Sequence, residues 1–176
     1  EDFFKSLNHF NKVIIDPESN RYFFIWNPVK VTVDKAPEQT IKLDLHPANP
    51  NQGKRTFKTK TEFYLTRDDY EALKQNKLYR LMDCLNFVRK KDKLLFESQK
   101  YEDYKERGEA IMHWLPLEEK TVDVEVLMPD ATLKKGLGEA KLSSLKVGDI
   151  VQLERLGFCR LDEKKDNTFK FWYAHR

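Results

Sequence analysis

The chain has 176 residues, of which 40% are hydrophobic, enough for one medium domain or two small domains with real cores. Its 32 Lys and Arg nearly balance 29 Asp and Glu, so the net charge of +3 does not by itself indicate a polyanion-binding protein. Cys84 and Cys159 lie far apart without Cys or His ligand spacing, which argues against a disulfide framework or a zinc site and favours a reducing cytoplasm.

The start of the chain and its hydropathy pattern bear on location. No apolar run approaches the roughly 18 residues of a membrane span, and residues 1–5 (EDFFK) do not resemble a signal peptide. Apolar residues recur at helical spacing over residues 2–10, which predicts the end of a helix whose packing partner lies upstream. We therefore expect a cytoplasmic protein with a short helical segment at this end.

Strand patterns dominate the rest of the chain. Aromatic residues are followed by alternating valines, with a bend or an edge position expected at Asn27 and Pro28. Thr66 can cap a short helix, because its hydroxyl accepts a free amide proton of the first turn. About ten short strands without βαβ spacing favour antiparallel barrels or sandwiches. The expected elements are strands at 22–33, 40–45, 56–65, 78–88, 93–102, 110–115, 122–128, 149–153 and 169–173, a loop at 46–53 and a helix at 68–74.

Three stretches of sequence carry a family resemblance. Residues 11–30 read NKVIIDPESNRYFFIWNPVK, residues 46–55 read HPANPNQGKR, and residues 148–162 read GDIVQLERLGFCRLD. Two shorter matches, LYRLM at 78–82 and IMHWL at 111–115, fall between them in the family's order. Together these stretches resemble the class I glutamyl/glutaminyl-tRNA synthetase family, and they are most similar to its archaeal glutamyl enzymes.

The resemblance implies an all-β fold of two L25-like antiparallel β-barrels, one proximal and one distal to a catalytic domain, with a short helical N-terminal segment. Residues 1–20 would connect to the catalytic domain, residues 21–77 and 129–176 would form the proximal barrel, and residues 78–128 the distal barrel. The HIGH-type and KMSKS-type motifs of class I synthetases do not occur in the sequence. We therefore expect no catalytic residue, metal or cofactor in this part, whereas ATP and magnesium are expected for the catalytic domain.

The implied function is recognition of the tRNA(Glu) anticodon within a glutamate–tRNA ligase, with tRNA(Gln) left open as a further partner and neither DNA nor a membrane expected. Met82 stands where bacterial glutaminyl enzymes carry an arginine used on the anticodon loop, which fits a protein that accepts the third-base cytosine of glutamate anticodons. The alternatives are a glutaminyl-tRNA synthetase module and an L25-like ribosomal protein that binds 5S RNA. A free-standing enzyme would need a catalytic constellation, but His46 and His113 have no general base or metal partner and are expected to be structural.

Gln152 and Arg155 are the leading candidates for reading a base. Uracil presents two carbonyl acceptors and one imino donor, so an amide that both donates and accepts can pair with it while a guanidinium reaches a second oxygen or a phosphate. In the family, the Gln and Arg of the matching Q-x-E-R motif contact the middle anticodon base. The alternative for Arg155 is an ordinary ion pair with Glu154 or another carboxylate on an exposed strand.

Five further residues complete the candidate tRNA anticodon interface. Arg21 and Arg80 match family arginines at the anticodon-binding face. Lys54 and Arg55, in a glycine-containing loop, could hold phosphates as positioning contacts without sequence information, or could belong to a plain solvated loop. Phe158 is the one aromatic residue retained as a base contact, because the others are expected in the barrel cores.

Overall fold

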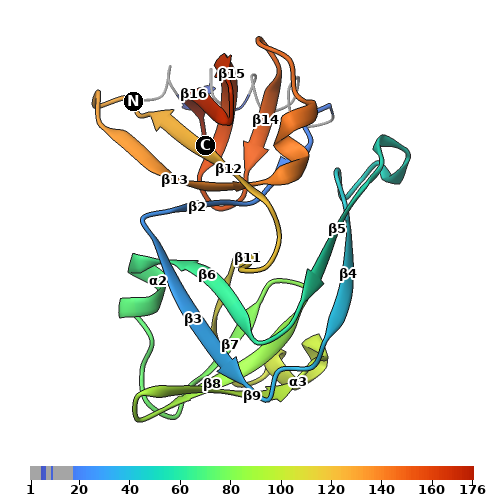
Figure 1. Ribbon diagram of the computed structural model, residues 1–176, viewed down its shortest axis with the longest axis vertical. Helices are drawn as coiled ribbons and strands as arrows, with labels where there is room; N and C mark the ends of the chain where they lie inside the picture. The colour runs from blue at the N-terminus through green and yellow to red at the C-terminus, as the bar shows by residue number, and fades with distance from the viewer. Residues whose placement is uncertain (1–4, 7–8, 10–17) are drawn as a thin grey trace.

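The computed structural model describes residues 5–6, 9 and 18–176, and its strands form two seven-stranded sheets and a separate hairpin (Figure 1). The all-β fold expected from the sequence is confirmed. The first sheet has the order β1-β14-β15-β16-β12-β13-β2. Its strands are β1 (Arg21–Tyr22), β2 (Phe24–Trp26), β12 (Thr121–Leu127), β13 (Leu133–Glu139), β14 (Ile150–Leu153), β15 (Gly157–Lys165) and β16 (Thr168–His175).

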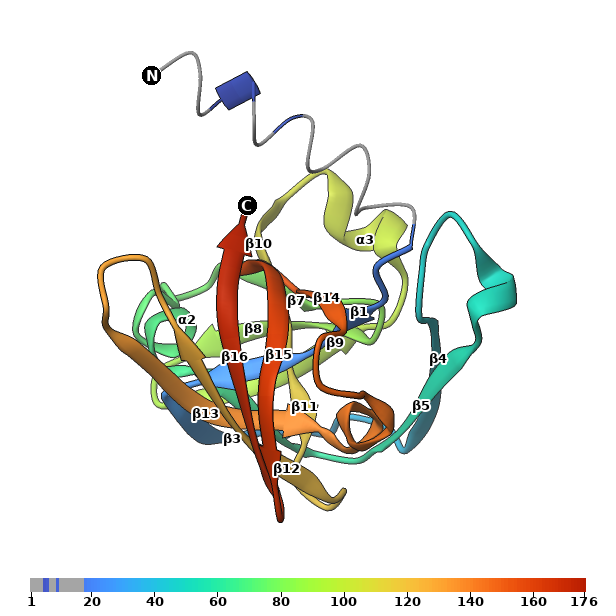
Figure 2. The ribbon, with the colours of Figure 1, turned by 90° about the horizontal axis from the view of Figure 1, so that it is seen from above.

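The second sheet has the order β10-β7-β8-β9-β3-β6-β11. Its strands are β3 (Pro28–Asp34), β6 (Glu62–Thr66), β7 (Leu78–Leu81), β8 (Leu85–Lys90), β9 (Lys93–Ser98), β10 (Gly108–Met112) and β11 (Leu115–Pro116). The separate hairpin pairs β4 (Gln39–Asp44) with β5 (Lys54–Thr59), and it projects to one side of the molecule (Figure 2). The expected loop at 46–53 forms its tip and contains the 3-10 turn η1 (Pro50–Gln52).

Both sheets contain parallel pairs, so the two units are not purely antiparallel. In the first sheet β1 pairs with β14 and β12 pairs with β16 in parallel. In the second sheet β10 pairs with β7 and β3 pairs with β9 in parallel. Parallel pairing needs a long crossover rather than a tight hairpin, and the strand patterns in the sequence do not reveal such crossovers.

The strand pairing groups the chain differently from the expected barrel boundaries. β3 and β6, expected in the proximal barrel, pair with each other in the sheet that holds β7, β8 and β9. β12, expected in the distal barrel, pairs with β13 and β16. Pairing therefore joins the strands of residues 28–116, except the β4–β5 hairpin, in one sheet, and those of residues 21–26 with those of residues 121–175 in the other.

The chain passes from the first sheet to the second at Asn27, as the expected bend requires. Its φ angle is 45°, a left-handed conformation that Asn tolerates better than most residues. The Asn27 N–H donates to the carbonyl of Lys135 at 3.0 Å, and the Asn27 carbonyl accepts from the Arg67 N–H at 2.9 Å. The turn is thus hydrogen-bonded to the first sheet through β13 and to the residue that follows β6 of the second sheet, which fixes where the two sheets meet.

The segment before this turn lies between two hydrophobic cores. Tyr22 and Phe24 belong to the core of the first sheet, whereas Phe23 and Ile25 belong to the core of the second. All four side chains are buried, which explains why this strand region is apolar at every position instead of alternating. The two sheets therefore share one buried junction.

Short helices complete the described chain. Thr66 accepts the Asp69 N–H at 3.1 Å and caps α2 (Arg67–Glu71), which confirms the predicted cap on a shorter helix. α3 (Tyr101–Lys105) occupies the end of the region expected to be a strand at 93–102, and η2 (Ala140–Ser144) follows β13. Residues 5–6 and 9 are helical, and the rest of the expected helix at 2–10 lies outside the described residues. Within the described part, no helix is long and apolar enough to cross a membrane.

Candidate nucleic-acid interface

Arg21 and Gln152 lie side by side at the edge of the first sheet. They are direct partners in the parallel pair of β1 and β14. The next pair, Tyr22 and Leu153, points into the core, so Arg21 and Gln152 belong to the opposite face of the sheet. The Nε of Arg21 and the Oε1 of Gln152 are both buried and have no hydrogen-bond partner among the described residues. The sheet edge thus contains one unused donor and one unused acceptor, and because both atoms are buried, a small side-chain movement must precede their contact with a ligand.

A cavity of about 420 Å³ opens beside Arg21. Three parts of the fold enclose it: the edge of the first sheet, the hairpin of β4 and β5, and the turn between β7 and β8. Burial raises the pKa of the Glu154 carboxyl, while Arg21 and Arg55 lower it. The cavity wall therefore carries both acidic and basic side chains. Its lining consists of Arg21, Lys42, Leu43, Asp44, Pro47, Arg55, Met82, Asp83 and Glu154.

Arg155 lies in the turn between β14 and β15, with a left-handed φ of 63°. Its guanidinium makes a bidentate ion pair with Asp69 on α2, with Nη1 2.6 Å from Oδ2 and Nη2 2.9 Å from Oδ1. The same Nη1 also lies 3.1 Å from Nδ1 of His113. The ion-pair alternative for Arg155 is therefore what the structure contains, although the carboxylate is Asp69 rather than Glu154.

His113 connects this ion pair to the first sheet. Its side chain is fully buried, and its Nε2 lies 2.7 Å from the carbonyl oxygen of Phe24. Because a carbonyl can only accept, Nε2 carries the proton and Nδ1 accepts from Arg155. Burial and, to a smaller extent, the charge of Arg155 together lower the pKa of His113 to about 4, so the imidazole is neutral near pH 7.

This pKa predicts a loss of stability in mild acid. An exposed imidazole in the unfolded chain titrates near 6.5, so the unfolded state binds more protons as the pH falls from 6.5 towards about 4. Across that window the free energy of unfolding should drop by up to about 3 kcal/mol through this group. The measurement is urea denaturation of wild type and His113→Gln at several pH values, because all other titrating groups are common to both. An equal pH dependence of the two proteins would contradict the prediction.

The fold and these sites can be compared with known proteins. Residues 19–109 match the family described as tRNA synthetases class I (E and Q), anti-codon binding domain, and residues 84–162 match a second family with the same description. The chain belongs to this anticodon-binding family. The resemblance seen in the sequence motifs is thereby confirmed.

Glutamate–tRNA ligases of archaea are among the relatives of this anticodon-binding chain. It is 38% identical to that of Methanocaldococcus jannaschii over 98% of its own length, 38% identical to that of Methanobrevibacter smithii over 98%, and 36% identical to that of Pyrococcus abyssi over 97%. It spans 31%, 30% and 31% of these three relatives, about a third of their length.

Two of the candidate arginines of the anticodon-binding domain have internal partners. Arg55 is 4% exposed, and its Nη1 lies 2.6 Å from Oε2 of the equally buried Glu139. Arg80 is 6% exposed, and its Nη1 donates to Oδ1 of Asn86 at 2.8 Å and to the carbonyl of Gln99 at 2.9 Å. Buried hydrogen bonds of this kind hold the fold together, so we do not retain these two guanidiniums as RNA ligands.

Phe158 and Lys54 have opposite surroundings. Phe158 is the direct partner of Gln152 in the pair of β14 and β15, but it is 1% exposed and its ring stacks on His175 at 4.7 Å. Its ring is therefore unavailable to stack on a base, contrary to the expectation from the sequence. Lys54 is exposed and lies 3.7 Å from the carboxylate of Asp44, so it remains available to a phosphate.

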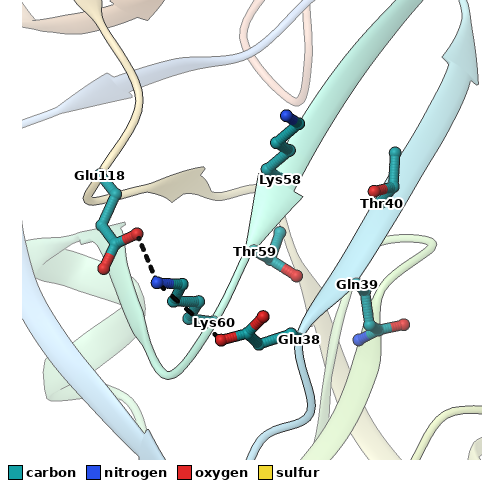
Figure 3. A pocket seen from close by; sticks show the side chains of 7 residues that line it. All are labelled: Glu38, Gln39, Thr40, Lys58, Thr59, Lys60 and Glu118. Carbon is teal, nitrogen blue, oxygen red and sulfur yellow. Dashed lines mark ion pairs between the residues drawn. The ribbon is translucent and has the colours of Figure 1, made fainter.

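A second cavity, of about 400 Å³, lies between the base of the hairpin and the loop after β11 (Figure 3). Lys60 at its mouth forms ion pairs with Glu118 at 3.4 Å and Glu38 at 3.9 Å. These exposed charges largely neutralise one another, and we assign no ligand to this cavity.

Sequence reasoning did not find Asp69, and it did not find the roles of His113 and Glu139. Asp69 is 86 residues away from Arg155 in the chain, and His113 is 42 residues away from it. Patterns within one strand or helix carry no information about such distant pairs. The one available signal was the position of Asp69 in the first turn of a capped helix, and this signal indicates favourable helix electrostatics rather than a partner.

Proposed function

We propose that this chain is the anticodon-binding part of a glutamate–tRNA ligase and that it binds tRNA(Glu) in the cytoplasm. The catalytic part of the same enzyme would attach glutamate to the tRNA with ATP and magnesium. The observation that carries the proposal is the unpartnered pair of polar atoms at Arg21 and Gln152, of which Arg21 lines the cavity of about 420 Å³, in a chain of the anticodon-binding family.

The chemistry of this pair suits an unstacked uracil, the middle base of glutamate anticodons. Gln152 can accept the imino N–H of uracil through Oε1 and donate to a neighbouring carbonyl through Nε2. Arg21 can donate Nε–H to the second carbonyl or to a phosphate of the loop. Arg155 and the exposed Lys54 would add contacts to the same loop. Those contacts that reach phosphates would position the RNA without reading its sequence.

A glutaminyl–tRNA ligase remains the second candidate, because the family that matches the chain covers both E and Q enzymes. Glutamate and glutamine anticodons share the middle uracil and differ in the third base, cytosine or guanine. Titrating anticodon stem-loops that differ only in this base distinguishes the candidates. Tighter binding of the guanine loop would replace tRNA(Glu) with tRNA(Gln) as the partner.

The test of the proposed contact is Gln152→Ala, titrated against tRNA(Glu) anticodon stem-loops with U or C at the middle position. For the U loop we expect a loss of about 1 kcal/mol, the size of one net hydrogen bond, which is roughly fivefold in affinity. For the C loop we expect little change, because cytosine lacks the imino proton that Gln152 would accept.

Gln39→Ala is the matched control. Gln39 lines the second cavity (Figure 3), so the same chemical change is made away from the proposed site. If Gln152→Ala weakened both loops equally, or behaved like Gln39→Ala, Gln152 would not read the middle base.

A further inference from the structure

The guanidinium of Arg155 has a defined set of used and unused donors. An arginine carries five N–H donors in a planar fork. Nη1 uses both of its protons, one on Asp69 and one on His113, and Nη2 uses one on Asp69. Two donors have no partner among the residues that the structure describes, Nε–H and the outer proton of Nη2, and they lie next to each other on one edge. The Arg155 side chain is 36% exposed.

Asp69 and His113, the two partners of this guanidinium, are each fixed by further contacts. Asp69 is in the first turn of α2, its N–H is bonded to the Thr66 hydroxyl, and its side chain is 15% exposed. His113 is fixed by its bond to the Phe24 carbonyl and lies 5.0 Å from the Trp26 ring, measured between ring centroids. A bidentate carboxylate together with an imidazole therefore fixes both the position and the plane of the Arg155 fork.

We propose that Asp69 and His113 are positioning residues, which hold Arg155 so that its Nε and Nη2 edge donates to oxygen acceptors of the anticodon loop. The inference rests on the proposed function. Two adjacent parallel donors match a pair of phosphate oxygens or an acceptor on a base edge. The ion pair also joins the turn between β14 and β15 to α2, so the fork is placed at the junction of the two sheets.

Asp69→Asn tests this role, with Asp68→Asn as the matched control. Both variants remove one negative charge from the first turn of α2, so their general electrostatic effect on RNA binding is the same. Asp68 is exposed, and its side chain forms no ion pair with any described residue. Asn at position 69 puts an amide NH₂ against the guanidinium and breaks the bidentate pair. We expect Asp69→Asn to bind the tRNA(Glu) anticodon stem-loop about tenfold more weakly than Asp68→Asn, the size expected when a charged hydrogen bond is lost.

Combination with Arg155→Ala separates positioning from a general structural effect. If Asp69 acts through Arg155, then Asp69→Asn and Asp68→Asn should bind equally once Arg155 is alanine. A structural role would keep the difference in both backgrounds and overturn the inference. His113→Gln, which retains a donor and an acceptor, provides a second variant if Asp69→Asn fails to fold in urea denaturation. His113→Gln should then weaken RNA binding when residue 155 is arginine and should have no effect when it is alanine.

The other possible results of the Asp69→Asn experiment each have a different meaning. Binding by Asp69→Asn that equals or exceeds that of Asp68→Asn would overturn the inference, because Asp69 would then be neutral or would compete with RNA for Arg155. Replacing the middle U of the loop with C separates the two acceptors: a loss on the U loop alone indicates a base, and an equal loss on both indicates a phosphate. Failure of the wild-type chain to prefer the tRNA(Glu) loop over one with a scrambled anticodon would remove the proposed function and this inference together.

Discussion

Replacing Arg55 with methionine is expected to lower the free energy of unfolding by about 3–5 kcal/mol, because the buried Glu139 carboxyl group must then either stay charged without its cation or take up a proton. Arg55 and Glu139 are 4% and 2% exposed, and Nη1 lies 2.6 Å from Oε2. The guanidinium also lies 4.5 Å from the centre of the Phe23 ring. Methionine retains most of the apolar stem, so the loss should reflect the charge. Urea denaturation with linear extrapolation measures it.

Two variants show whether the missing charge is responsible. Lys54→Met changes the neighbouring cation, whose ion pair with Asp44 is exposed, and should cost at most about 1 kcal/mol. In Arg55→Met with Glu139→Gln, no ionised group stays buried and the glutamine can still accept the Phe23 N–H. Part of the lost stability should therefore return. A loss in Arg55→Met no larger than that in Lys54→Met would show that the buried pair does not stabilise the fold.

The pH dependence of Arg55→Met follows from the same pair. Burial raises the pKa of Glu139 to about 7 even though Arg55 and the Phe23 N–H act to lower it. Since the folded pKa exceeds the unfolded value of 4.5, this group's contribution to stability is complete below pH 4.5 and is lost as the pH rises to about 7. Removing Arg55 raises the folded pKa further. The stability deficit of Arg55→Met should therefore stay nearly constant below about pH 6 and grow as the pH rises above about 7, where wild type has lost this proton and the variant still holds it.

Local features of the fold could be predicted from the sequence where one short segment contains the whole signal. The alternating burial of Val122, Val124 and Val126, the bend at Asn27 and the cap at Thr66 are confirmed for this reason. Each depends on a strand period, a backbone preference or a hydroxyl within a few residues of its partner. Which strands pair depends on distant contacts, such as Val33 with Leu94, and these leave no such pattern.

Arg55 shows how a small error in a strand boundary changes the interpretation of a side chain. The sequence predicted a strand from residue 56, with Arg55 in the preceding loop. β5 begins two residues earlier, at Lys54, and its burial alternates so that Arg55 shares the buried face with Phe57 and Thr59. Arg55, expected in a loop as a phosphate contact, thus belongs to an ion pair in the core. For Arg21 and Gln152, by contrast, the family motifs pointed to two positions that β1 and β14 place side by side.

Replacing Gly136 with alanine is expected to cost about 4 kcal/mol or more, at the upper end of single substitutions. Gly136 on β13 is the partner of Trp26 on β2. A Cβ at Gly136 would lie 1.9 Å from the backbone oxygen of Ile25 and 2.8 Å from its carbonyl carbon. Backbone cannot swing aside as a side chain can, and β2 is fixed by the buried Ile25 and by the bond from Asn27 to Lys135. The strands would have to separate, with loss of their hydrogen bonds.

Gly148→Ala is the control, because it isolates backbone strain from steric overlap. Gly148 has a φ of +97° and no atom within 4 Å of an added Cβ, so alanine there should cost only about 1 kcal/mol through strain. Urea denaturation of both variants gives the comparison. β2 continues through Asn27 into the second sheet, and His113 bonds to the Phe24 carbonyl on the same strand. Separation of β2 from β13 should therefore also loosen the support of Arg155. Equal costs for the two variants would show that the spacing of β2 and β13 adjusts freely, and the junction would then not hold Arg155 in a fixed position.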